Sequence, residues 1–268
     1  VTVAGGTLNV GFADTVGVVT MSSGAITGAG TLTGTSFGFS GGTSSTHLAG
    51  PLTVSGAVGL SGTLSGSATV DTGGTLTLGA SDVIVDGNTV VVQGGGTLAL
   101  GGYSDTVGAV QLIDGAITGT GGTLSSTSAF DVRKGSVSAK LGGGVGLTKT
   151  TADTVTLSGA NTYTGVTTLS QGTLSVATIG NGGVAGNLGQ AGTGAANLVL
   201  GGGTLQYTGA SESTDRGFTL AAGTTATIDV TTGGTNLTLA GASATTTGAL
   251  TKVGAGTLTL SGSNSYTG

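Results

Sequence analysis

The sequence predicts an all-β protein, and within that class a right-handed parallel β-helix. Three observations predict this fold. Glycine supplies 59 of the 268 residues, against a usual share of about 7 per cent. Glu212 is the only glutamate and Lys and Arg number six, whereas helices need such residues on their solvent face. The tripeptide Gly-Thr-Leu recurs along the whole chain.

The Gly-Thr-Leu copies predict where strands begin. Glycine permits a positive φ at the turn, and the leucine then shares one face of the strand with the residue two positions later. In residues 74–78 this pattern places Leu76 and Leu78 inside and Thr75 and Thr77 outside. The copies begin at Gly6, Gly30, Gly62, Gly74, Gly96, Gly122, Gly172, Gly203 and Gly256.

Two longer repeats organise the chain. Residues 5–28 recur as 95–119, and both copies contain Asp-Thr-Val-Gly and Gly-Ala-Ile-Thr-Gly. Residues 147–165 recur as 250–268, with Leu-Thr-Lys followed by Thr-x-Thr-Leu-Ser-Gly-x-Asn-x-Tyr-Thr-Gly. Irregular spacing favours a loose solenoid of about ten to twelve coils, each of roughly 20 to 30 residues. Because the composition is uniform and no linker interrupts it, we expect a single β-helical segment over residues 1–268.

Composition excludes several other classes. A net charge of −5 with six basic residues leaves no dense basic face for nucleic acid. The absence of cysteine excludes disulfides and thiol metal sites. Gly, Ser and Thr interrupt every apolar run before the 18 or so residues of a membrane helix. Tryptophan is absent and aromatic residues make up 3%, which disfavours a β-propeller. We interpret a start at Val1 without an initiator methionine as an excised segment.

Candidate catalytic residues are few. His47 is the only histidine, is expected to lie in a polar loop, and has no nucleophile motif beside it, so we expect a solvated side chain rather than a general base. Ranks of Thr-x-Thr are a candidate for ice binding, but they are unevenly spaced, and Thr is a favourable outward residue in any strand. We therefore assign no catalytic residue, no metal ligand and no cofactor.

Two charged groups are candidates for surface contacts. Asp82, Asp86 and Asn88 are spaced at even steps, so they share one side of a strand and have oxygens suited to calcium or to glycan chemistry. Arg133 and Lys134, with Lys140 close by in the sequence, form the second group. The simpler interpretation of both groups is a solvated outward face. Their clustering in one groove would favour an enzyme, and their dispersal a structural role.

The second pair of long repeats resembles a known family. Residues 250–268 are similar to the autotransporter-associated β-strand repeat, also called the passenger-associated transport repeat, and residues 147–176 resemble a fuller copy. In the fuller copy Asp153 and Val155 stand where Gly256 and Leu258 stand in the other. The motif residues are Gly159, Asn161, Tyr163 and Gly165 in one copy and Gly262, Asn264, Tyr266 and Gly268 in the other.

The resemblance implies a β-helical passenger of a type V secreted protein, exported across the outer membrane of a Gram-negative bacterium to the surface or beyond. It implies a C-terminal β-barrel translocator as partner in the full-length chain. The lack of cysteine fits passage through a narrow pore. Because residues 250–268 stop within the repeat, we expect a cut boundary at Gly268.

We expect a non-enzymatic surface stalk or adhesin that associates with itself or attaches to host cells or matrix through many weak contacts. Two alternatives stay open. The first is a released effector or toxin that binds a host receptor, for which residues 12–16 and 180–194 are the places to look. The second is a glycan-active β-helix enzyme.

Overall fold

The chain folds as a parallel β-solenoid, which confirms the predicted fold class. A computed structural model describes residues 1–268. It contains no α-helix and one short 3₁₀ turn, η1 (Ala195–Asn197). About 14 turns are present, so the expectation of ten to twelve coils is wrong. The reason is that several coils are shorter than the expected 20 residues: Leu52 pairs with Ala68 only 16 positions later.

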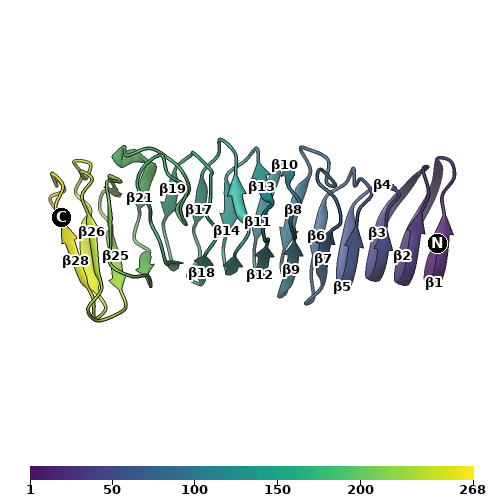
Figure 1. The fold of residues 1–268 in the computed structure, drawn as a ribbon, viewed down its shortest axis with the longest axis horizontal. Coiled ribbons are helices and arrows are strands. Elements are labelled where there is room, and N and C mark those ends of the chain that lie inside the picture. Colours follow the sequence, from purple (N-terminus) through teal and green to yellow (C-terminus); the bar gives the residue numbers. More distant parts are fainter. The chain divides into compact units, whose positions relative to one another are not determined.

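Two compact units divide the chain, Val1–Ser128 and Ala129–Gly268. In each unit the strands of successive turns lie side by side, as Figure 1 shows. The strands of the first unit are β1 (Thr2–Asn9), β2 (Asp14–Thr27), β3 (Thr31–Ser44), β4 (His47–Ala49), β5 (Leu52–Leu60), β6 (Ala68–Val70), β7 (Thr75–Leu78), β8 (Thr89–Val92), β9 (Gly96–Ala99), β10 (Asp105–Val107), β11 (Ala109–Leu112), β12 (Gly115–Thr118) and β13 (Thr123–Ser126).

The first unit begins with long strands and continues with short ones. Strands β1, β2, β3 and β5 pair in that order, all parallel. From β5 two ladders continue, one through β7, β9 and β12 and the other through β6, β8 and β11. The sequence repeat 5–28/95–119 is therefore not a structural copy, because β2 is one strand where its counterpart forms β10, β11 and β12.

The second unit is built from three parallel ladders. One contains β14, β17, β19, β21 and β24, another β15, β18, β20, β22, β25 and β27, and the third β23, β26 and β28. Its strands are β14 (Phe130–Val132), β15 (Gly135–Val137), β16 (Lys140–Gly142), β17 (Leu147–Lys149), β18 (Thr154–Leu157), β19 (Thr167–Leu169), β20 (Thr173–Val176), β21 (Leu198–Leu200), β22 (Thr204–Tyr207), β23 (Glu212–Thr214), β24 (Thr219–Leu220), β25 (Thr225–Val230), β26 (Asn236–Leu239), β27 (Ala249–Val253) and β28 (Thr257–Leu260).

Alternation along each strand builds the core of each unit. In β7, Leu76 and Leu78 are buried while Thr75 and Thr77 lie outside or partly outside, as the sequence predicts. Successive turns place the same kind of side chain in the same position, because parallel strands pair in register about 4.8 Å apart. Small aliphatic residues therefore fill the interior with few aromatic rings.

The glycine of Gly-Thr-Leu has a different role from the predicted one. Only Gly6 and Gly172 adopt a positive φ. In the other copies a Cβ atom would strike the preceding turn, as at Gly62, where it would lie 2.0 Å from the carbonyl oxygen of Thr46. The residue is glycine because the turn before it, in most copies through its backbone, approaches too closely for a side chain.

Gly121 and Gly122 offer a matched test of this close approach. A Cβ on Gly122 would lie 1.7 Å from the carbonyl oxygen of Tyr103, whereas a Cβ on Gly121 meets nothing within 4 Å, and neither residue has a positive φ. We expect Gly122→Ala to lower the free energy of unfolding by about 1 to 3 kcal/mol or more, as overpacking does. Gly121→Ala should stay within about 0.5 kcal/mol of the wild type. Denaturant titration monitored by circular dichroism measures both, and equal stability of the two variants would contradict the explanation.

Candidate functional site

The motif of residues 147–176 is buried inside the second unit. Asn161 is fully buried and its side chain joins two other turns. Its Oδ1 accepts the backbone N–H of Leu141 at 2.9 Å, and its Nδ2 donates to the carbonyl oxygen of Asn187 at 2.8 Å. Asn at this position therefore supplies the donor and the acceptor that fasten one turn to its neighbours.

Tyr163 completes this buried motif. Its hydroxyl forms a hydrogen bond of 2.8 Å with Oγ1 of Thr167, and its ring lies 6.1 Å from that of Phe130. Burial raises the pKa of the Tyr163 phenol above its ordinary value, so the hydroxyl stays neutral at every physiological pH. The position is structural, since a fully buried hydroxyl is not accessible to a partner.

The second motif copy is more exposed. Asn264 is exposed and donates only to the carbonyl oxygen of Gly262, at 2.9 Å. Tyr266 is half-buried, with its ring 6.4 Å from Phe218. The four motif glycines share one feature: a Cβ atom on any of them would lie within 2.6 Å of the backbone of the preceding turn. They are Gly159, Gly165, Gly262 and Gly268.

One turn of the second unit is much longer than the others. Thr167 pairs with Leu198, 31 positions later, whereas Leu147 pairs with Thr167 only 20 positions later. The extra residues lie in the segment 177–194 between β20 and η1, which we call the long loop. It contains one of the two regions that the sequence suggests for receptor contacts.

Charged side chains hold the base of the long loop. The carboxylate of Glu212 accepts the backbone N–H groups of Ile179 and Gly180, at 3.0 and 2.6 Å, and the hydroxyl of Tyr207 at 2.8 Å. Asp215 accepts the N–H of Gly182 at 2.7 Å. Glu212, the only glutamate of the chain, therefore holds the base of the loop through hydrogen bonds.

Arg216 holds the loop from the inside. Only 4% of this side chain is exposed. Its guanidinium donates to four carbonyl oxygens of the loop, and Nη2 to Gly189 is the shortest of these contacts at 2.7 Å. The other three acceptors are the carbonyl oxygens of Gly180, Val184 and Ala191. Burial lowers the pKa of Arg216, while Tyr163, Asp215 and Glu212 act in the opposite direction.

The sequence did not predict that Glu212, Asp215 and Arg216 hold the long loop. Glu212-Ser-Thr-Asp-Arg216 places three charges within five residues of a chain that is only 6% charged, and that density is the signal that could have indicated them. Their partners lie about 30 residues earlier in the sequence, so only the tertiary structure shows what they hold.

The tip of the long loop is exposed while its base is buried. Val184 is 55% exposed, and Asn181 and Gly183 are exposed as well. Residues 186–189 are buried. An apolar side chain presented on a firmly held loop is suited to contact with another molecule, because little conformational entropy is lost when it binds.

The acidic group of the first unit has a structural arrangement. Residues 82–88 do not form the strand that the alternation predicted: Ile84 makes a single parallel bridge with Leu64, residues 86–87 form a turn, and Asp82 and Asp86 are exposed. Asp82 adopts a left-handed φ of 54°, a conformation that Asp tolerates better than most residues. The neighbouring N–H groups of Val83 and Ile84 both donate, at 3.0 Å, to Oδ2 of Asp105.

Asp105 is the residue that sequence reasoning missed here. It is 1% exposed, and its Oδ1 has no hydrogen-bond partner. Burial raises the pKa of its carboxyl group to about 6, the two backbone N–H groups lower it in part, and the charges of Asp82 and Asp86 raise it further. No group of three or more acidic or histidine side chains in the chain is arranged to hold a metal ion.

The basic group lies in the second unit. Arg133 donates to Oδ2 of Asp131 from both Nε and Nη2, at 3.0 and 2.7 Å, and Lys134 is exposed. The hydrogen bonds with Asp131 raise the pKa of Arg133. Arg133 is thus part of a local surface ion pair, and such pairs contribute about 1 kcal/mol or less.

His47 does not lie in a loop but begins β4. Its Nδ1 lies 3.4 Å from Oγ1 of Thr31, and its Nε2 forms a hydrogen bond with Oγ of Ser65. These hydroxyls belong to the turns before and after β4. Because no carboxylate orients the ring, the arrangement lacks the third member of a catalytic triad.

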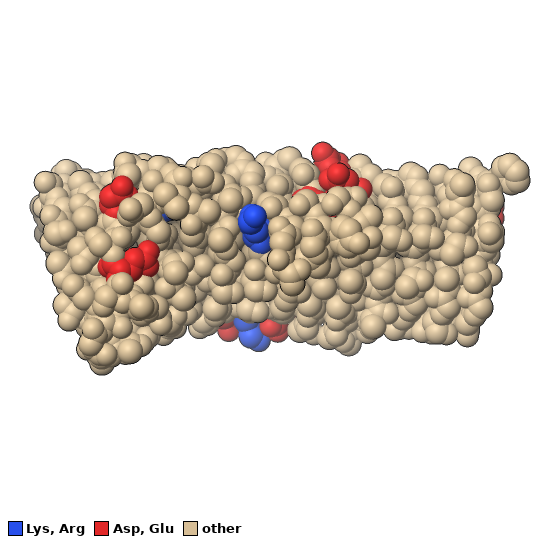
Figure 2. Space-filling view, in the orientation of Figure 1, with Lys and Arg blue, Asp and Glu red and all other residues tan.

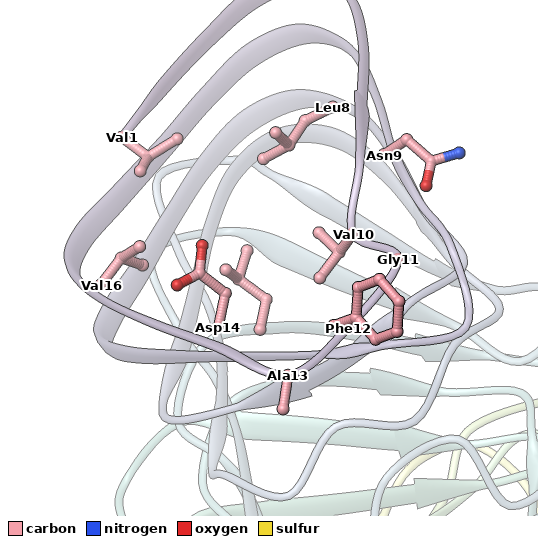
Figure 3. A pocket seen from close by; sticks show the side chains of 10 residues that line it. Val1, Leu8, Asn9, Val10, Gly11, Phe12, Ala13, Asp14 and Val16 are labelled. Atoms are coloured by element: carbon pink, nitrogen blue, oxygen red, sulfur yellow. The ribbon is translucent and has the colours of Figure 1, made fainter.

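A hollow of about 300 Å³ opens at the first coil. Figure 3 shows Leu8, Val10 and Asp14 directed into it, while Asn9 points away. Phe12, which lies in the second region suggested for receptor contacts, is 89% exposed at the rim. The lining is mostly apolar, and Asp14 is its only ionisable side chain.

Most of the surface carries no charge. On the face drawn in Figure 2 the acidic and basic residues form small separate groups within an uncharged surface. The uncharged outward positions are largely Thr, Ser and Gly. No helix of the chain is long and apolar enough to cross a membrane.

Comparison with known proteins gives two matches. The model of the passenger-associated-transport-repeat family matches residues 147–176 and 250–268. The chain is also 43% identical over 198 residues, 72% of its length, to an adhesin, the BmaC autotransporter of Brucella suis biovar 1 (strain 1330). The chain is a stretch of autotransporter passenger with passenger-associated transport repeats. It spans about 5% of the length of this relative, and no solved structure matches it.

The hydrogen bonds from Arg216 to the long loop predict that loss of this side chain loosens the loop and lowers stability. Arg216→Ala removes a donor from four carbonyl oxygens, of which those of Gly180 and Ala191 keep the Thr214 hydroxyl and the Gly183 N–H as donors. The other two, of Val184 and Gly189, lose the guanidinium donor, and an unsatisfied buried group costs about 1 to 3 kcal/mol. We expect faster amide hydrogen exchange over residues 179–191 and a lower free energy of unfolding. Arg133→Ala is the control, because it removes only a surface ion pair. Unchanged exchange in Arg216→Ala would contradict this role.

Asp105 predicts a pH dependence of stability. Its folded-state pKa of about 6 lies above the unfolded value of about 3.9, so the folded state binds the proton more tightly. Stability is therefore greatest below about pH 4 and falls by on the order of 2 to 3 kcal/mol as the pH rises to 6. Asp105→Asn keeps an acceptor for both N–H groups and should lose this slope, whereas Asp86→Asn should keep it. Denaturant titrations between pH 4 and 8 measure it, and parallel profiles for wild type and Asp105→Asn would contradict the assignment.

Proposed function

We propose that this passenger segment is part of a non-enzymatic adhesin that is exported across the bacterial outer membrane and attaches the cell to host cells, matrix or other bacteria. The observation that carries the proposal is the 43% identity to an adhesin autotransporter over 72% of the chain. In the full-length chain, the proposed partner for export is a C-terminal β-barrel translocator.

The surface chemistry supports attachment through many weak contacts. Outward Thr, Ser and Asn side chains offer hydrogen bonds along each unit, and the low charge imposes little long-range repulsion on an approaching surface. Repeated weak contacts add up by avidity when many copies of a protein are displayed together. The charged candidates contribute less to this proposal, since Arg133 is engaged by Asp131 and Asp82 belongs to a structural turn.

The long loop is the strongest candidate for a specific contact. It presents Val184 at 55% exposure from a base held by Glu212 and Arg216. A loop whose base is held in place loses little conformational entropy when its apolar tip binds a partner. We propose it as the contact that distinguishes one attachment partner from another.

Attachment by displayed passenger tests the proposal. Bacteria that do not otherwise adhere would display the segment, and binding to immobilised matrix proteins, to epithelial cells and to one another would be counted. We expect at least one of these surfaces to retain cells above the level of an empty display vector. Retention on none of them would overturn the adhesive function.

A loop variant refines the same experiment. Val184→Asp places a charge on the exposed tip without disturbing the buried base, and it should reduce attachment several-fold with unchanged thermal stability. Val85→Asp is the matched control, since Val85 is also an exposed valine, at 40%, in the other unit. Equal attachment by the two variants would assign adhesion to other parts of the surface.

A further inference from the structure

The tip of the long loop contains the only Asn-Gly pair of the chain, Asn181-Gly182. An asparagine followed by glycine loses its side-chain ammonia more readily than any other asparagine. The reason is that the next backbone nitrogen attacks the side-chain carbonyl, and glycine has no Cβ to obstruct the ring that forms. Every other asparagine precedes Val, Thr, Leu or Ser, whose side chains slow this reaction. The sequence therefore singles out one reactive position, and it lies at the exposed tip.

Asp215 contacts both of the groups that would react. Its Oδ1 accepts the backbone N–H of Gly182 at 2.7 Å, and its own backbone N–H donates to Oδ1 of Asn181 at 3.1 Å. A carboxylate at hydrogen-bond distance from an N–H group is placed to take its proton. A donor on a carbonyl oxygen stabilises the negative charge that develops there during attack. One residue therefore assists the nucleophile and the electrophile together.

The backbone around this pair is held in place. The N–H of Val184 donates to the carbonyl oxygen of Asn181 at 3.1 Å, which closes a turn in which Gly183 has a φ of 79°. A Cβ atom on Gly182 would lie 2.6 Å from the backbone nitrogen of Thr193, so the packing of the loop requires the same glycine that the reaction favours. Groups held close together react faster than the same groups in a flexible chain.

We propose that Asn181 is a site of self-modification, at which Asp215 promotes conversion of the asparagine to aspartate and isoaspartate. The nitrogen of Gly182 forms a bond to Cγ of Asn181 while its proton passes to the Asp215 carboxylate. The bond between Cγ and Nδ2 then breaks, and the amide nitrogen takes that proton and leaves as ammonia. Water opens the resulting succinimide at either carbonyl, giving the two products. Asn181 and Asp215 are both exposed, so water reaches the ring.

The products change the charge and the backbone of the tip. A carboxylate at position 181 lies beside the carboxylate of Asp215, and like charges repel. Isoaspartate also adds a methylene group to the backbone between positions 181 and 182. Both effects loosen the tip next to the exposed Val184. The reaction needs no partner, so this inference does not rest on the adhesive function.

Comparing the folded and the unfolded chain tests whether the fold promotes the reaction. The purified 268-residue chain would be kept at neutral pH in water labelled with a heavy oxygen isotope, and peptide mapping by mass spectrometry would separate aspartate from isoaspartate at position 181. We expect both products, each with one labelled oxygen, to form several-fold faster than in the same chain unfolded in guanidinium chloride. Equal or slower conversion of the folded chain would overturn the proposal, because Asp215 would then protect Asn181.

Asp215→Asn tests the part played by the carboxylate. The variant keeps the backbone N–H that contacts Asn181 and an oxygen that accepts from Gly182, but it has no base to take the proton. We expect conversion at position 181 to be several-fold slower than in the wild type, with an unchanged circular dichroism spectrum. Asp153→Asn is the matched control, since Asp153 is another exposed aspartate of the second unit and lies outside the long loop. An unchanged or faster rate in Asp215→Asn would overturn the proposal.

Asn181→Asp measures what the modification does to the loop, because it reproduces one product in every molecule. We expect amide hydrogen exchange over residues 181–184 to become several-fold faster than in the freshly purified wild type. Exchange over β18 and β20, away from the tip, should stay the same. Unchanged exchange over residues 181–184 would overturn the predicted loosening of the tip.

Discussion

The close pairing of each turn with the turn before it is the constraint on which the rest of the structure depends. Parallel strands about 4.8 Å apart leave room for a stacked interior of Leu, Val and Ile but none for a side chain where the backbone turns a corner. Glycine at Gly62 and Gly122, and at the motif positions Gly159 and Gly165, follows from this spacing. The high glycine content is therefore a consequence of coil-to-coil contact more than of turn conformation.

Where the backbone departs from the regular turn, polar side chains inside the structure form hydrogen bonds with its backbone groups. The long loop leaves the ladder for more than ten residues, and only a few of its backbone groups pair with a neighbouring turn, as Gly186 does with Asn161. Glu212, Arg216 and Asn187 form hydrogen bonds with several of the others. A chain with few charges thus uses several of them to hold irregular backbone, and Asp105 does the same for the turn at Asp82. The cost of burying such a group is visible in the raised pKa of Asp105.

The low content of charged residues also determines the chemistry of the surface. Glu212, Arg216 and Asp105 form hydrogen bonds inside the structure, and Arg133 pairs with Asp131. The exterior therefore offers mainly hydroxyls, amides and a few exposed apolar side chains. Such a surface suits repeated weak contacts, which accords with the similarity to an adhesin autotransporter.

The sequence by itself determined the solenoid class, the inward leucines and outward threonines, and the transport repeats, because these depend on local alternation and on repetition. It also indicated the long loop as a surface of interest. Only the tertiary structure decided that Glu212 and Arg216 hold that loop, that Asp105 is buried while Asp14 of the matching repeat is exposed, and that residues 82–88 form no continuous strand. The physical reason is register: which side chain meets which backbone group depends on the number of residues in each coil. That number varies from 15 to 31 between paired positions without a signal in the local sequence.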